Sequence, residues 1–408
     1  MFSHTKTLNL LYTLGDLSGI GPEIFFKFTR DLERISEQEW QFNKNVKIIL
    51  ADDLSEVKKN TALLKMGEAS SISGEHSYQT LVKAHSLCLS GLADYLITGP
   101  VSKESLSLAK HHYSGQTELL AKLNKLTASD VEMLFIAQGT AHDENAEMGV
   151  PQQPPDGTAH KRASSRLRRR NDRSVLEVIS SDAEHARQVS YASKRKYKLD
   201  LSSLHEDHED NENAEIGVCE QSPNDFRIIL ATRHIPLNEV SKELQQNFHK
   251  VIKHSIELLG TVFNIKSPSI GIAGLNPHAG ENGLIGDEES TWMNEVIKSF
   301  RSLHPETNLT DTLPADSILA QAARAFLKGE SVAHDLYISA YHDQCLPLIK
   351  GIAGYNAINM TYGLPYIRVS VDHGCAFDIA GQGIADHSAL LACTNFCIQQ
   401  SLRNNPNI

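Results

Sequence analysis

The sequence contains no apolar run that approaches about 18 residues, the length that a membrane-spanning helix needs. Cysteine is scarce. Only six cysteines occur, and they are scattered along the chain and form no C-x-x-C pair. Only Cys393 and Cys397 are close, at a spacing that predicts packing within a helix. The first residues, MFSHTKTLNLLYTLGD, lack the long apolar core and the cleavage site of a signal peptide. These absences predict a reduced cytoplasmic protein without a membrane span.

Common nucleotide-binding and hydrolase signatures are also missing. In GDLSGIGPEIFF, Gly15, Gly19 and Gly21 do not match G-x-G-x-x-G, and no Walker lysine follows. No G-x-S-x-G elbow occurs. The segment is therefore compatible with a phosphate-binding loop or with a tight turn that leads into a helix beginning near Pro22.

The overall composition is that of an ordinary globular protein. The chain has 408 residues, of which 40% are hydrophobic and 22% charged, and this length predicts two or three domains. The formal net charge of -11 argues against nucleic acid as the main partner.

Residues 139–223 differ from the rest of the chain. They include a proline-rich stretch, VPQQPPDG, a basic run at 161–173 and an acidic run at 205–215. Such a segment buries too little apolar surface to offset its ordering entropy, which predicts a disordered or loosely packed insert. Because strand-like sequences flank it, the insert is interpreted as replacing a tight connection. A partner-binding or nucleic-acid-binding arm is the alternative, and the arginine cluster alone supports it.

Outside the insert, strand-like and helical patterns alternate, which predicts an α/β fold with a largely parallel sheet or two such sheets. Helices are expected at 239–259, 316–327 and 385–402. Ligands of such sheets bind beyond the carboxyl ends of the strands. The expected strands are LNLLYTLGD, VKIILAD, ADYLITGP, VEMLFIAQ, FRIILATRH, SIGIAGLNPH, DLYISAYHD, NAINMT and IRVSVDHG.

Three of these strands end near a histidine: His234, His278 and His342. A single histidine of this kind is more often structural, but three at equivalent strand ends predict a divalent metal site. Imidazole ligands favour Zn²⁺, Co²⁺, Mn²⁺ or Fe²⁺, with Zn²⁺ preferred and Mg²⁺ a weaker alternative. Asp343 either orients His342 or turns the chain.

Three further side chains are expected on the same face, just beyond or within strands: Lys350, Asn359 and Arg368. A lysine, an amide and a guanidinium together suit a phosphate or a carboxylate. The alternatives are simple solvation for Lys350 and a structural salt bridge for Arg368.

Taken together, the motifs resemble those of the 4-hydroxythreonine-4-phosphate dehydrogenase family of vitamin B6 synthesis. They occur in the family's order and cover nearly the whole chain outside residues 139–223. They are GDLSGIGPEI, ITGPVSK, SGQTELLA, ATRHIPL, GLNPHAGENG, LPADS, YHDQCLPLIK and INMTYGLPYIRVSVDHG.

The resemblance implies two α/β/α domains with an interdomain cleft, as in isocitrate and isopropylmalate dehydrogenases. Residues 1–128 and 330–408 would form one domain, and residues 129–329 a second that carries the contacts of a homodimer. NAD or NADP would lie in the cleft. A metal site shared between subunits and a substrate site are implied as well, with His234, His278 and His342 as metal ligands and Thr117, Lys350, Asn359 and Arg368 as substrate contacts.

The activity that this resemblance implies is NAD(P)-dependent and metal-dependent oxidation of 4-phosphohydroxy-L-threonine. The β-keto acid product would lose CO₂ to give 3-amino-2-oxopropyl phosphate. The proton acceptor is not evident from the sequence. Lys103 and Asp316 are candidates, although a surface lysine and a helix N-cap are the simpler interpretations.

One departure from the family concerns the substrate site. The family motif G-H-T-E reads Gly115-Gln116-Thr117-Glu118 here, and glutamine can donate a hydrogen bond but cannot titrate. This difference leaves a second hypothesis open, a dehydrogenase of threonate or erythronate 4-phosphate. A decayed non-catalytic module and an acyl-phosphate transferase are less consistent with an intact histidine set.

Overall fold

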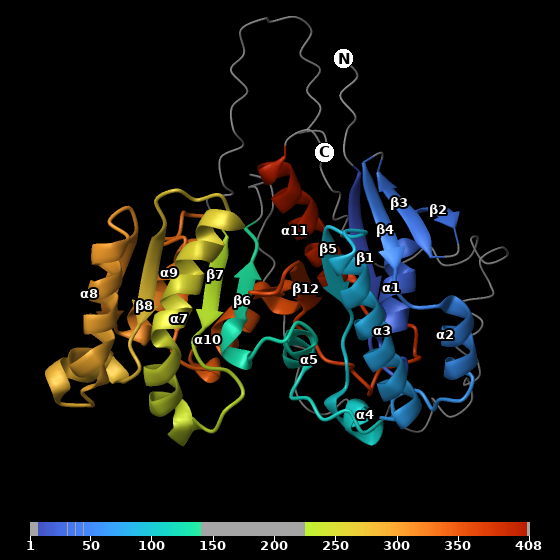
Figure 1. Ribbon diagram of the computed structural model, residues 1–408, viewed down its shortest axis with the longest axis horizontal. Helices are drawn as coiled ribbons and strands as arrows, with labels where there is room; N and C mark the ends of the chain where they lie inside the picture. The colour runs from blue at the N-terminus through green and yellow to red at the C-terminus, as the bar shows by residue number, and fades with distance from the viewer. Residues whose placement is uncertain (1–6, 31, 37, 44, 140–224, 406–408) are drawn as a thin grey trace, which may run out of the picture. The chain divides into compact units, whose positions relative to one another are not determined.

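A single twelve-stranded sheet runs through the residues that the computed structural model describes, which are 7–30, 32–36, 38–43, 45–139 and 225–405 (Figure 1). The strands lie in the order β2-β3-β4-β1-β5-β12-β11-β6-β7-β10-β8-β9. These residues belong to one unit. A second unit, residues 147–221, and almost all of the predicted insert lie outside the described residues.

The element bounds are as follows. The strands are β1 Leu8–Thr13, β2 Glu33–Ser36, β3 Glu39–Asn43, β4 Val46–Leu50, β5 Tyr95–Thr98, β6 Glu132–Ala137, β7 Phe226–Leu230, β8 Ser269–Ala273, β9 Asn308–Leu313, β10 Leu336–Ser339, β11 Ile358–Tyr362 and β12 Ile367–Val371. The helices are α1 Gly21–Thr29, α2 Leu54–Thr61, α3 Ser71–Leu89, α4 Lys103–Leu108, α5 Gln116–Leu123, α7 Val240–Thr261, α8 Asn294–Leu303, α9 Ala315–Leu327, α10 His342–Ala353 and α11 Ser388–Asn404.

All nine expected strands and the three expected helices are present. The pattern did not reveal β2, β3 and β9. Every residue of β2 is exposed, and β9 is largely polar, so neither carries the apolar alternation from which strands were predicted. None of the helices in the described part of the chain combines the length and apolar character that crossing a bilayer requires.

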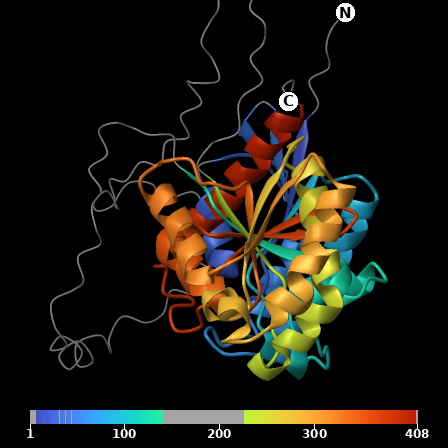
Figure 2. The same ribbon diagram turned by 90° about the vertical axis from the view of Figure 1, so that its left-hand side faces the viewer.

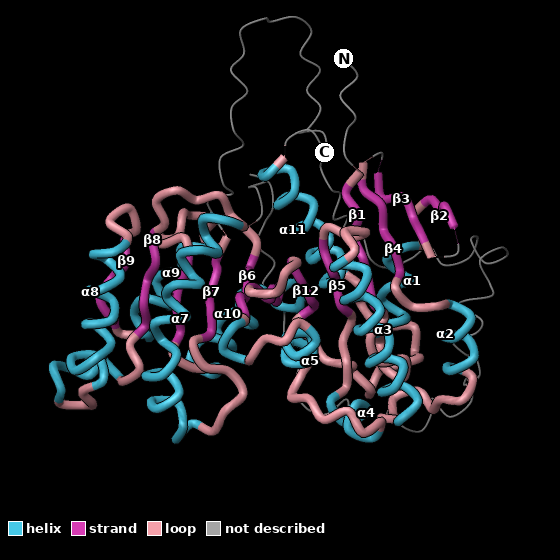
Figure 3. The backbone as a smooth tube through the Cα atoms, viewed as in Figure 1, coloured by secondary structure: helices cyan, strands magenta, loops and turns pink. Residues whose placement is uncertain are grey.

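The sheet, whose strands are magenta in Figure 3, is mixed, which corrects the expectation of a largely parallel sheet. One parallel group contains β4, β1, β5 and β12, and a second contains β7, β10, β8 and β9. Two central strands, β11 and β6, join the groups through antiparallel pairs. The strand β10 lies among strands of the segment 129–329, although the resemblance assigns residues 330–408 to the other domain.

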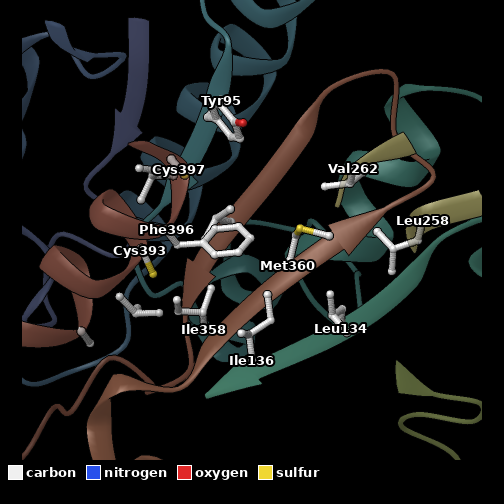
Figure 4. Packing of buried hydrophobic residues seen from close by; sticks show 14 of the residues in the cluster. Tyr95, Leu134, Ile136, Leu258, Val262, Ile358, Met360, Cys393, Phe396 and Cys397 are labelled. Carbon is white, nitrogen blue, oxygen red and sulfur yellow. The ribbon is translucent and has the colours of Figure 1, made fainter. Parts of the chain in front are cut away.

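Helices cover both faces of the sheet (Figure 2). One face carries a continuous apolar core under α1, α7, α8 and α11. Figure 4 shows its middle, where Ile358 and Met360 lie near Ile136 and Phe396. Cys393 and Cys397 are fully buried in this core, which confirms their predicted packing role.

The opposite face carries two separate apolar clusters. The first lies under α3 and α5, and the second under α9 and α10. Because side chains alternate along a strand, the non-core positions of the intervening strands β5, β12 and β11 also point to this face. These positions are polar and form a buried polar band between the two clusters, consisting of Thr98, Asn359, Thr361, Arg368 and Ser370.

The turn after β1 brings its end close to the end of β5. Gly15 has φ +79°, and a Cβ at this position would lie 2.2 Å from the Pro100 carbonyl oxygen, so only glycine fits. The Asp16 N–H donates to the same oxygen at 2.8 Å. Pro22 lies in the first turn of α1, as predicted.

We predict that replacing residues 140–224 by a short turn preserves the fold. The two ends of the replaced segment already meet, because Ala137 pairs with Phe226 and the Gly139 N–H donates to Asp225 Oδ1 at 3.3 Å. Since a shorter loop costs less entropy to close, the free energy of unfolding should stay equal or rise by about 2 kcal/mol. Denaturant unfolding of both chains measures it, and a loss of several kcal/mol would show that the segment stabilises the sheet.

Candidate active site

The centre of the polar band is Arg368, whose side chain is surrounded by hydroxyl groups. Its Nε and Nη2 donate to Thr98 Oγ1 at 3.0 and 2.8 Å, and its Nη1 donates to Thr361 at 3.2 Å and Thr117 at 3.3 Å. Arg368 is only 3% exposed. Within the described ranges, no carboxylate forms an ion pair with it, which contradicts the alternative of a structural salt bridge. The predicted contacts Thr117 and Arg368 therefore lie together.

Burying this cation is costly because the surrounding hydroxyls carry no compensating charge. Burial lowers the pKa of Arg368 to about 10, and Glu118 opposes this effect from beyond ion-pair distance. Arg227 is equally buried, but its Nη2 lies 2.6 Å from Asp225 Oδ2. Arg368 therefore differs from Arg227 in having no carboxylate partner, and its charge is one that an anionic ligand could balance.

The other two predicted substrate contacts, Asn359 and Lys350, lie on different elements. Asn359 lies opposite Ser370 in the β11–β12 pair, and its buried Oδ1 has no hydrogen-bond partner. Lys350 lies on α10, not beyond or within a strand as expected. Its side chain is half-exposed, and its Nζ lies 3.1 Å from Asp372 Oδ2, so the predicted simple solvation is accompanied by an ion pair. Burial raises the pKa of Asp372, and Lys350 opposes that shift.

Two of the three predicted metal ligands come together. The ring centroids of His234 and His342 are 5.5 Å apart. His342 Nδ1 lies 2.6 Å from Asp343 Oδ1, which leaves Nε2 available for a ligand and fits the orienting role proposed for Asp343. His342 is the first residue of α10 and lies just beyond β10, so it does not end the strand itself.

The electrostatic surroundings favour a neutral His234. Partial enclosure lowers the pKa of its imidazole, and the charge of Lys103 lowers it further, while Glu118 opposes both. Neutral imidazole is the form that binds metals. Lys103 is exposed at the start of α4. Asp316 is exposed in the first turn of α9, but Pro314 occupies the N-cap, so the N-cap interpretation of Asp316 was wrong.

His278 does not join the other two histidines. Among the residues that the structure describes, no three metal-binding side chains form one group. His278 is exposed and begins a run with positive φ, in which His278, Ala279, Glu281 and Asn282 have values of 54, 51, 43 and 57°. Such backbone costs roughly 1–2 kcal/mol per non-glycine residue and persists only where neighbouring contacts impose it.

Acidic side chains anchor the start of this loop at Asn276, two residues before His278. Glu289, which is buried, accepts from the Asn276 backbone N–H at 2.7 Å and from its side-chain amide at 3.0 Å. Glu288 accepts from the same amide at 2.7 Å. A cavity of ≈ 400 Å³ adjoins the loop and is lined in part by His278, Asn282, Asn294 and Thr312. The chain thus fixes His278 in an exposed position beside a space that could hold a small molecule.

Sequence reasoning identified Thr98 and Asp372 only as polar residues at the carboxyl ends of strands, without a role in the site, and it missed Thr361. Thr361 could have been found, because it follows Asn359 by two residues on a strand and must share its face. Thr98 required the pairing of β5 with β12, and Asp372 required the position of α10, which sequence periodicity does not give.

We predict that Arg368→Met separates binding from stability. The substitution removes a buried cation without a counter-ion, so the free energy of unfolding should stay equal or rise. Binding of inorganic phosphate should weaken by about 100-fold, as expected for two lost charge-assisted hydrogen bonds. Denaturant unfolding and calorimetric titration measure the two quantities.

Arg227→Met is the matched control, because Arg227 is equally buried but paired. Breaking its contact with Asp225 should cost about 3–5 kcal/mol of stability and leave phosphate binding unchanged. If Arg368→Met behaves like this control, Arg368 is a structural residue and the anion site lies elsewhere.

The curated proteins to which this chain is similar include several 4-hydroxythreonine-4-phosphate dehydrogenases. A 4-hydroxythreonine-4-phosphate dehydrogenase of Synechocystis is 29% identical over 412 residues, covering 94% of this chain and 93% of that protein. The protein of the same name from Paracoccus denitrificans is 41% identical over 178 residues, covering 43% of this chain and 52% of that protein.

Among solved structures, the 4-hydroxythreonine-4-phosphate dehydrogenase from Klebsiella pneumoniae superposes with a TM-score of 0.61 at 23% identity. The match covers 97% of this chain and all of that chain. At this identity the likeness shows the fold that the two chains share.

The sequence model of one protein family, the pyridoxal phosphate biosynthetic protein PdxA, matches residues 19–142 and 194–397. The unmatched stretch 143–193 falls inside the predicted insert. Every residue of the site described above lies within the matched ranges. The chain therefore belongs to the PdxA family of pyridoxal phosphate biosynthesis.

Proposed function

We propose that this chain is an NAD(P)-dependent dehydrogenase of 4-phosphohydroxy-L-threonine. The observation that carries the proposal is the buried, unpaired guanidinium of Arg368, which accounts for the phosphate of such a substrate. The names of the relatives and membership of the PdxA family support the dehydrogenase activity.

Within this proposal, Arg368 and Thr117 hold the phosphate, and Asn359 and Lys350 complete its shell. Asn359 contributes an N–H of its side-chain amide, because a phosphate oxygen accepts hydrogen bonds and cannot pair with the unpartnered Asn359 oxygen. Lys350 reaches the ligand by giving up part of its contact with Asp372, since its side chain is half-exposed and has room to move. Fixing one end of the substrate in this way orients the distant hydroxyl for reaction.

The histidines suit the other end of the substrate. His234 and His342 supply a pair of imidazoles at the ends of β7 and β10, and the nitrogen donors fit a divalent ion of the zinc type. A bound ion would supply Lewis-acid polarisation of the substrate oxygens, and a bound nicotinamide would supply the hydride acceptor. Asp343 keeps the His342 ring in the tautomer that such binding requires.

A second subunit accounts for the position of His278. We propose that His278 completes the histidine set of a partner chain in a homodimer. It is exposed, and its backbone is held by Asn276 and Glu289 rather than by contacts to the other two histidines. Leu237 and Leu284, which follow His234 and His278, are 71% and 84% exposed, and such apolar side chains favour burial against another chain.

The direct test is NAD⁺ or NADP⁺ reduction with 4-phosphohydroxy-L-threonine, compared with threonate and erythronate 4-phosphates. We expect the amino acid phosphate to have the highest kcat/KM and a chelator to abolish the activity, with recovery on adding Zn²⁺, Co²⁺ or Mn²⁺. Higher kcat/KM with a sugar-acid phosphate would support the alternative function, and chelator-resistant activity would contradict the metal site.

The shared site predicts complementation between inactive variants. His278→Ala and His342→Ala should each be inactive alone. Dissociating and reassociating an equal mixture should restore about a quarter of wild-type activity, because half of the dimers are mixed and each carries one intact site. If the mixture remains inactive although mixed dimers form, the three histidines do not assemble across subunits.

A further inference from the structure

The orientation of the Gln116 side chain is fixed by the backbone. Gln116 is the first residue of α5, and its Nε2 donates to the Gly99 carbonyl oxygen at 2.9 Å. Its Oε1 is buried and has no hydrogen-bond partner. A carbonyl oxygen can only accept, so turning the amide over would place two oxygens in contact. Gln116 therefore presents an acceptor, not a donor, on the side away from Gly99.

This acceptor lies beside the anion site. The next residue, Thr117, accepts a hydrogen bond from Arg368. Thr13 and Asp16 also carry buried side-chain oxygens without partners, and their backbones are hydrogen-bonded to Gly99 and Pro100. A buried acceptor without a donor costs roughly 1–3 kcal/mol. A ligand that brings donors to this region removes that cost.

We propose that Gln116 Oε1 accepts a hydrogen bond from the substituent on carbon 2 of the substrate, an ammonium or a hydroxyl group, and so selects substrates that carry a donor there. The inference rests on the proposed function. A phosphate oxygen is excluded as the partner because two acceptors repel.

The reacting hydroxyl on carbon 3 is a poor partner for a different reason. It must give up its proton during oxidation, and a neutral amide oxygen does not take up a proton near neutral pH. The substituent on carbon 2 keeps its hydrogens throughout the reaction. Gln116 is thus a specificity residue that leaves the proton transfer to other groups.

The test uses three substrates that differ only at carbon 2: 4-phosphohydroxy-L-threonine, threonate 4-phosphate and 3-hydroxy-4-phosphobutanoate, which carries hydrogen there. Each is assayed with wild type and with Gln116→Met, which keeps the length of the side chain but removes the acceptor. We expect Gln116→Met to lower kcat/KM by about tenfold or more for the first two substrates, and to change it by less than about twofold for the third.

Gln116→Glu provides a second variant, which keeps an acceptor and adds charge. We expect it to raise the preference for the ammonium over the hydroxyl substrate by about tenfold, whichever of the two wild type prefers. Gln79→Met, on the exposed side of α3, is the matched control and should behave as wild type.

An equal loss with all three substrates in Gln116→Met, with no change of preference in Gln116→Glu, would overturn the proposal. That pattern would make Gln116 a general support for the turn at Gly99. Wild-type enzyme that reduces no NAD⁺ or NADP⁺ with any of the three substrates would instead refute the proposed function, so the two failures are distinguishable.

Discussion

A guanidinium buried without a counter-ion is the constraint from which the other features of the site follow. Arg368 is held by the hydroxyls of Thr98, Thr117 and Thr361, which fix its geometry but leave its charge unbalanced. Burying a cation in this way is costly, and the proposed role of Arg368 is that a bound anion offsets this cost. The adjacent polar positions and the break between two apolar clusters on this face of the sheet are consistent with such an anion site.

The arrangement of the strands explains how the site could bind a ligand whose two ends differ chemically. Arg368 lies within β12, in the middle of the sheet, whereas His234 and His342 lie beyond the ends of β7 and β10 in the second parallel group. The antiparallel strands β11 and β6 separate the two groups. A ligand that spans from the polar band to the histidines therefore needs an anionic group at one end and metal-binding oxygens at the other, which a phosphorylated hydroxy acid has.

Much of this could be predicted from the sequence, and the rest could not for identifiable reasons. Apolar alternation located the nine core strands, and residue chemistry selected Arg368 and the histidines. Alternation carries no information about strand direction, so the strands β11 and β6 were located but their antiparallel pairing was missed. The position of Lys350 on α10 was also missed, because the helix follows β10 after only two residues. The acceptor role of Gln116 depends on Gly99, seventeen residues earlier, and only the fold brings the two together.

The central claim is that the unpaired charge of Arg368 marks where the phosphate of the substrate binds. A crystal structure of the wild-type protein with a bound phosphorylated hydroxy acid tests it most directly. The account predicts phosphate oxygens within hydrogen-bonding distance of Arg368 Nη1 and of Thr117 Oγ1, with the hydroxy-acid end directed towards His234 and His342. A bound ligand whose phosphate lies away from Arg368, with the guanidinium still enclosed by hydroxyls alone, would contradict it.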